Sequence, residues 1–134
     1  MTPFAGPDRD SLRRQWRDAW QRYRSGTLLE PLQASLVAVI TAHPEYQPCM
    51  DSDSASGADA AFLHLGLHLA LREQLATDRP SGIRVVRQAL ETRGLDAHAA
   101  EHRMMEVLAD TLWEAQQARS APDERTYLRD LRNI

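Results

Sequence analysis

The stretch AFLHLGLHLALREQLATDRPSGI, residues 61–83, decides the fold class because it joins a leucine-rich helical pattern to a turn. Residues four apart on an α-helix lie on nearly the same face. One face of this segment therefore carries two histidines among leucines: His64, His68, Leu67, Leu71 and Leu75. The pattern predicts a helix over about residues 60–76. The TDRPSG sequence then forms a turn that leads into the next helix.

Helical spacing continues over most of the remaining chain, and capping residues mark the expected ends. The predicted helices are about 12–24 capped by Asp10 or Ser11, 31–42 starting at Pro31, 82–93 ending before Gly94, 97–119 capped by Asp96, and a short final helix with Pro122 near its first turn. No strand alternation, internal repeat or domain linker is evident in the sequence. The prediction is an all-α, single-domain helical bundle of about five to six helices covering residues 1–134.

Two segments are expected to be irregular. Residues 1–9 precede the first helical pattern, and residues 44–59 are rich in Pro, Ser, Asp and Gly. The second segment is long for a loop in a compact domain.

Composition limits the classes of function. A length of 134 residues suits one domain, and 43% apolar residues suffice for a core. The net charge of -3 argues against nucleic-acid and membrane partners. Cys49, the single cysteine, cannot form an internal disulfide or a thiolate cage, which fits a reducing compartment. With no signal-peptide pattern at the N-terminus, the expected location is the cytoplasm. Partners are unknown, and assembly as a homo-oligomer is left open.

A second histidine pair lies in HAAEHRMMEVL, residues 98–108. His98, His102 and Glu101 fall on the side of the predicted helix that also carries Met105 and Leu108. Two separate pairs with this spacing would arise by chance on the order of once in a hundred sequences. A buried neutral imidazole has one donor and one acceptor, and leaving either unpaired costs roughly 1–3 kcal/mol. The four histidines therefore need partners.

Two explanations stay open. In the first, the chain binds a divalent metal (Zn, Fe, Mn or Ni), and the candidate ligands are His64, His68, His98, His102 and Glu101, with His43 as an addition from the HPEY segment. Glu101 is then the only candidate catalytic residue, and whether the protein is an enzyme is undecided. In the second, the chain is a non-enzymatic interaction or regulatory protein whose histidines form a buried, pH-responsive hydrogen-bond network. The string HAAEH also matches the inverted zinc-peptidase pattern, but those enzymes need a far larger mixed fold.

Several motifs together resemble a known family: HPEY, FLHLGLHLALREQL, D.P.GI and HAAEHRMMEVLADTLWEAQ. The chain is similar over about residues 12–132 to a proteobacterial family of uncharacterised small proteins, domain of unknown function eighteen forty-one. The resemblance implies a small cytosolic bacterial protein and brings no activity, substrate or cofactor. This sequence departs from the family pattern at Gln47, at Ala60–Ala61 and at Arg72. The Gln47 departure weakens the idea that the HPEY segment supplies a complete ligand set.

Overall fold

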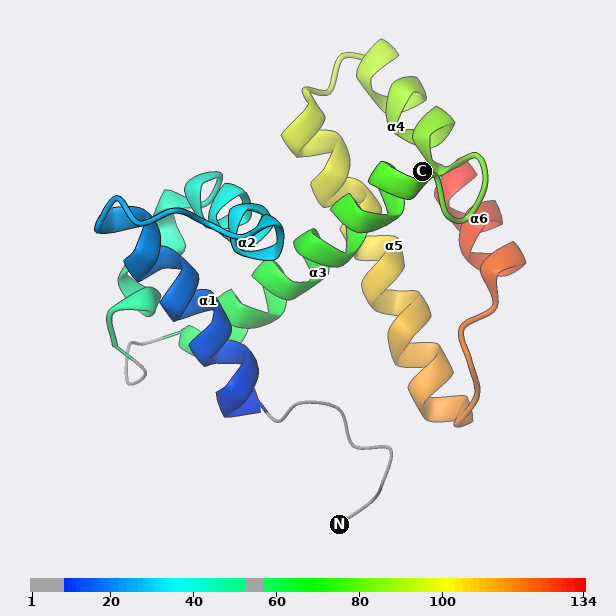
Figure 1. Ribbon diagram of the computed structural model, residues 1–134. Helices are drawn as coiled ribbons and strands as arrows, with labels where there is room; N and C mark the ends of the chain where they lie inside the picture. The colour runs from blue at the N-terminus through cyan, green and yellow to red at the C-terminus, as the bar shows by residue number, and fades with distance from the viewer. Residues whose placement is uncertain (1–8, 53–56) are drawn as a thin grey trace. The chain divides into compact units, whose positions relative to one another are not determined.

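The computed structural model describes residues 9–52 and 57–134 and is helical in both ranges. Its elements in chain order are α1 (Arg9–Arg24), α2 (Pro31–Thr41), the 3-10 helix η1 (Pro44–Met50), α3 (Ala58–Thr77), α4 (Ile83–Thr92), α5 (Ala97–Ala118) and α6 (Glu124–Arg132) (Figure 1). The described residues contain no strand, so the all-α prediction is confirmed. They contain seven helices, slightly more than the predicted five to six.

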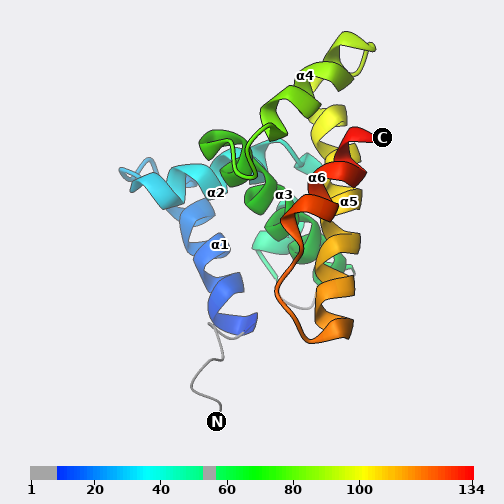
Figure 2. The same cartoon turned by 90° about the vertical axis from the view of Figure 1, so that its right-hand side faces the viewer.

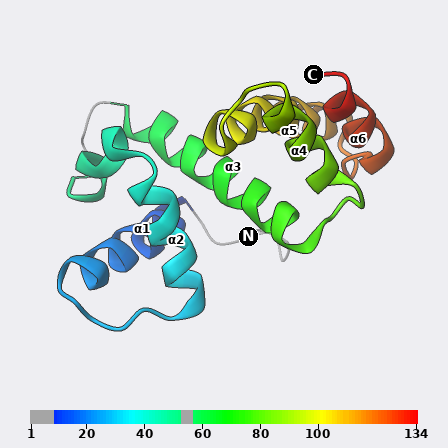
Figure 3. The same ribbon diagram turned by 90° about the horizontal axis from the view of Figure 1, so that it is seen from above.

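The chain divides into two compact units, Met1–Leu65 and Gly66–Ile134. In the first unit α1 and α2 pack against each other (Figure 3). Trp16, Ala19 and Trp20 are buried on α1, and Leu36, Val37, Val39 and Ile40 are buried on α2. The first residues of α3 also belong to this unit, where the guanidinium groups of Arg13 and Arg17 lie over the ring of Phe62.

The second unit holds the rest of α3 with α4, α5 and α6. Helices α4 and α6 both pack on α5, as the views in Figures 1 and 2 show. Its apolar core consists of Leu71, Leu75, Ile83, Val86, Leu90, Ala100, Met104, Met105, Leu108, Tyr127 and Leu131. This core holds in place the part of α5 that carries the second histidine pair. The prediction of a single domain over residues 1–134 stays a prediction.

The sequence located the start of α5 correctly because its cap is strong. The carboxylate of Asp96 accepts a hydrogen bond from the backbone N–H of Ala99 at 2.8 Å. Gly94 follows α4 with a φ of 106°, a left-handed conformation that glycine adopts without a Cβ clash. These two residues define the turn that leads into His98.

Three predictions about the ends of α1 and α6 need correction. Asp10 and Ser11 do not cap the first helix, because α1 already includes Arg9; the carboxylate of Asp10 lies in the first turn, where the helix dipole favours it. Pro122 precedes the final helix, whose cap is Asp123, a side-chain acceptor for the N–H groups of Arg125 and Thr126. The prediction for residues 1–9 is wrong at Arg9, and residues 1–8 lie outside the described residues.

The irregular segment predicted over residues 44–59 is largely structured. Residues Pro44–Met50 form η1, which begins and ends with short-range bonds from the N–H of Tyr46 to the carbonyl of His43 and from the N–H of Asp51 to the carbonyl of Pro48. A proline-rich composition conceals such a 3-10 turn because proline fits its first positions. The last two residues of the predicted loop belong to α3, and residues 53–56 are not described.

Among the described residues, none of the helices combines the length and the hydropathy that a bilayer span requires.

Candidate metal centre

Three histidines come together in the second unit. His68 lies on α3, and His98 and His102 lie one turn apart on α5. The ring centroid of His68 is 5.3 Å from that of His98 and 5.2 Å from that of His102, and the two α5 rings are 4.1 Å apart. Each residue offers one ring nitrogen, and these nitrogens lie within 4.8 Å of one another. The grouping joins imidazoles from two different helices.

The local sequence explains why the α5 histidines point inward. Because Asp96 caps α5, His98 falls in its first turn and His102 in the second. Ala100, Met104 and Met105 place one side of α5 in the core. His98 and His102 are half-buried at the edge of this side, whereas His68 is completely buried.

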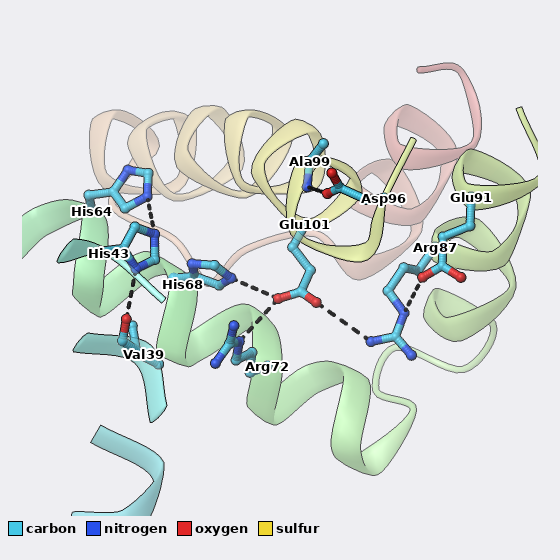
Figure 4. Close-up of polar contacts among 10 residues, drawn as sticks. All are labelled: Val39, His43, His64, His68, Arg72, Arg87, Glu91, Asp96, Ala99 and Glu101. Atoms are coloured by element: carbon cyan, nitrogen blue, oxygen red, sulfur yellow. Dashed lines mark hydrogen bonds and ion pairs between the residues drawn. The ribbon is translucent and has the colours of Figure 1, made fainter. Parts of the chain in front are cut away.

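Glu101 connects the histidine group to two arginines (Figure 4). Its Oε1 accepts hydrogen bonds from Nε2 of His68 at 2.7 Å and from Nε of Arg72 at 3.1 Å. Its Oε2 lies 3.8 Å from Nη1 of Arg87 on α4. The side chain of Glu101 is only 8% exposed, so these cations compensate a carboxylate that water does not solvate well.

The same contacts set the ionisation of Glu101. Burial alone would raise the pKa of this carboxyl, but the hydrogen bonds from His68 and Arg72 outweigh burial and lower the pKa from 4.5 to about 2. Glu101 is therefore a carboxylate at neutral pH and can only accept hydrogen bonds.

An ionised Glu101 fixes the tautomer of His68. Because Nε2 of His68 donates a proton to Glu101, Nδ1 is the ring nitrogen left to bind a metal ion. A carboxylate that accepts from the far nitrogen of a ligand histidine is the usual orienting arrangement in protein metal sites, and it raises the basicity of the ligand nitrogen. Glu101 is thus placed to orient His68.

The nitrogen spacing can be compared with the needs of a metal ion. A tetrahedral ion with metal–nitrogen bonds of about 2.0–2.1 Å holds its ligand nitrogens roughly 3.4 Å apart. Nitrogens at most 4.8 Å apart must each move by no more than about an ångström to reach this spacing. Rotation of His98 and His102, which are half-buried, can supply that movement.

The other two histidines form a group within the first unit (Figure 4). His43 ends the turn after α2, and its Nδ1 donates to the carbonyl of Val39 at 2.8 Å. Its Nε2 is therefore an acceptor and receives the Nε2 proton of His64 across 3.1 Å. The ring of Tyr46 stacks on His43 with centroids 5.6 Å apart and lies 5.4 Å from the ring of His64. These contacts join the two imidazoles in a hydrogen-bonded pair.

The predicted site residues are described unit by unit. The second unit brings together His68, His98, His102 and Glu101, and the first unit brings together His43 and His64. Sequence reasoning missed Arg72 and Arg87. Arg72 follows His68 by one helical turn, so the i,i+4 rule could have placed it beside the same partner. Arg87 reaches Glu101 from another helix and left no sequence signal.

The family described as Domain of unknown function (DUF1841) matches residues 8–133, so the chain belongs to this family. The resemblance drawn from the histidine motifs is therefore confirmed. No curated protein and no solved structure shows significant similarity to the chain.

Proposed function

We propose that this member of the DUF1841 family binds one divalent transition-metal ion through His68, His98 and His102. The observation that carries the proposal is the grouping of three imidazole nitrogens, contributed by two helices, within 4.8 Å of one another. The hydrogen bond from His68 to the ionised Glu101 supports it, because this is how ligand histidines are oriented.

The donor set narrows the choice of metal. Three neutral imidazoles suit zinc, iron or nickel better than manganese, which prefers oxygen ligands. Glu101 is proposed to orient His68 and not to ligate the metal, because its two oxygens already face His68, Arg72 and Arg87. This assignment replaces the roles of ligand and base that the sequence left open for it.

The number of protein ligands bears on activity. Three ligands leave one position of a tetrahedral ion for water, whose pKa the metal would lower toward neutrality. A fourth protein ligand would make the site structural instead. Catalytic activity would follow only from a site with three protein ligands, so it is tested once metal binding is shown. The metal-ligand roles predicted for His43 and His64 stay predictions.

The alternative is a metal-free regulatory or interaction protein with a buried histidine network. The hydrogen-bonded pair of His43 and His64 favours this alternative, since these two rings satisfy each other without an ion. Bacterial origin, cytoplasmic location and assembly as a homo-oligomer likewise stay predictions.

Titration with Co²⁺ separates the two functions. Adding Co²⁺ to metal-free, untagged protein is expected to produce visible d–d absorption that saturates at one equivalent and disappears when Zn²⁺ is added. The His98→Ala variant should show weaker absorption and no sharp end point, because one of the three nitrogens is gone. If the unsubstituted protein with Co²⁺ absorbs no more strongly than Co²⁺ in buffer alone, the result would favour the metal-free network.

A further inference from the structure

A cavity of about 300 Å³ lies directly beside Glu101 in the second unit. Its walls are formed by Arg72, Leu75, Ala76, Arg87 and Glu101, which come from α3, α4 and α5. Two guanidinium groups and one carboxylate therefore line the cavity. The charge that faces a small molecule in this cavity is net positive.

Arg87 makes only long contacts with the two carboxylates beside it. Its Nη1 is 3.8 Å from Oε2 of Glu101, and its Nε is 3.6 Å from Oε1 of Glu91. Both separations exceed the length of a good N–H···O hydrogen bond. The Nε atom is buried and has no hydrogen-bond partner among the described residues. A buried guanidinium nitrogen without an acceptor is costly, so an acceptor supplied by a ligand would stabilise it.

Arg72 on α3 adds a second group of hydrogen-bond donors to the cavity. Its Nε donates to Glu101, which leaves the other N–H groups of its fork for a further acceptor. The planar forks of arginine match the paired oxygens of carboxylates and phosphates. The side chains of Arg72 and Arg87 are 32% and 34% exposed, so a ligand can reach them from solvent.

From this geometry we propose that the cavity binds a small oxyanion, a carboxylate or a phosphate group, between Arg72 and Arg87. The inference deepens the proposed function, on which it rests, by naming the class of molecule brought to the metal centre. Glu101 joins the two sites, since its Oε1 accepts hydrogen bonds from both His68 and Arg72 and its Oε2 faces Arg87. An anion in the cavity would compete with Glu101 for the two guanidinium groups.

The test is calorimetric titration at low salt with inorganic phosphate and, separately, with acetate. Both metal-free and zinc-loaded protein are titrated, and the metal content of each sample is measured independently. One anion should bind per chain. The anion that binds more tightly, phosphate or acetate, identifies the chemical class of the ligand. Arg87→Gln and Arg72→Gln should each weaken binding by about tenfold or more, because each removes charge-assisted hydrogen bonds. Arg87→Lys should retain part of the affinity, since it keeps the charge and loses only the fork.

Two further variants make the outcome specific. Arg103→Gln removes the same charge from an exposed position on α5 and should bind as tightly as the unsubstituted protein. Glu101→Gln should bind the anion more tightly in the metal-free form, because it removes the competing carboxylate; a purely structural role for Glu101 predicts weaker binding.

The inference is overturned if neither anion binds, or if Arg72→Gln and Arg87→Gln bind as well as the unsubstituted protein. If zinc-loaded protein binds the anion and neither arginine substitution changes the affinity, the anion binds to the metal itself. That result would contradict the cavity site and agree with the proposed function. Binding that follows the arginines in a protein that takes up no metal would support the cavity and reject the metal centre.

Discussion

Replacing His102 with alanine is expected to reduce the metal content of the purified protein to background while the helices stay folded. His102 is one of three nitrogen donors, and the other two cannot hold a divalent ion tightly in competition with water. Loss of an orienting partner alone weakens metal binding by about 10–100-fold, so loss of a ligand should exceed about 100-fold. Because His102 is half-buried, its removal leaves a smaller defect in the core than removal of the fully buried His68 would.

The measurement is equilibrium dialysis against Zn²⁺ followed by elemental analysis, with circular dichroism as the check on folding. Arg103→Ala is the matched control, since it changes the next residue of α5 at an exposed position and should retain the metal. Undiminished metal content in His102→Ala would show that this imidazole is not a ligand.

The second large effect is expected on stability. Glu101→Ala should lower the free energy of unfolding by about 2–4 kcal/mol in metal-free protein. The substitution leaves the buried N–H of His68 without this acceptor and removes the carboxylate beside Arg72 and Arg87, of which Arg87 keeps Glu91 at 3.6 Å. The arginines are about one third exposed and regain hydration, which keeps the estimate below that for a fully buried charge.

Urea unfolding measures this change. Glu106→Ala is the control, because it removes a carboxylate from an exposed position of the same helix and should change stability by less than about 0.5 kcal/mol. Equal effects of the two substitutions would mean that the contacts of Glu101 contribute nothing beyond those of an ordinary surface carboxylate.

The same carboxyl predicts how stability depends on pH. The folded pKa of Glu101 is lowered from 4.5 to about 2, so the folded state favours the ionised form. Its contribution, on the order of 3 kcal/mol, is fully present above pH 4.5 and is lost as the pH falls toward 2. Metal-free Glu101→Gln should therefore lose less stability than the unsubstituted protein over this pH interval, as urea midpoints at successive pH values will show. Parallel pH profiles would contradict the ion pairs described for Glu101.

The helices were largely predictable because their ends carry local signals. Pro31 at the start of α2, Gly94 after α4 and Asp96 before α5 act within a few residues of the chain, and sequence shows them directly. The 3-10 helix after His43 was not found, because a proline-rich segment reads as a loop when only composition is considered.

The candidate site was predictable only in part. Helical spacing placed His98, Glu101 and His102 on one side of α5 and showed that His64 and His68 share a face. The spacing of residues along a helix shows which side of the helix a side chain lies on, but it does not show which residue of another helix the side chain contacts. It could not show that His64 pairs with His43, or that Glu101 is compensated by Arg87 from α4. Such contacts depend on how separate helices pack.

The most direct test of the account is the metal content of untagged protein purified without chelator. The proposed metal centre predicts about one zinc, iron or nickel ion per chain, and a lower melting temperature after a chelator has removed it, since an ion that binds only the folded state stabilises that state. A metal content far below one ion per chain, with a melting temperature that chelator leaves unchanged, would contradict the metal centre and leave the histidines as a hydrogen-bonded network.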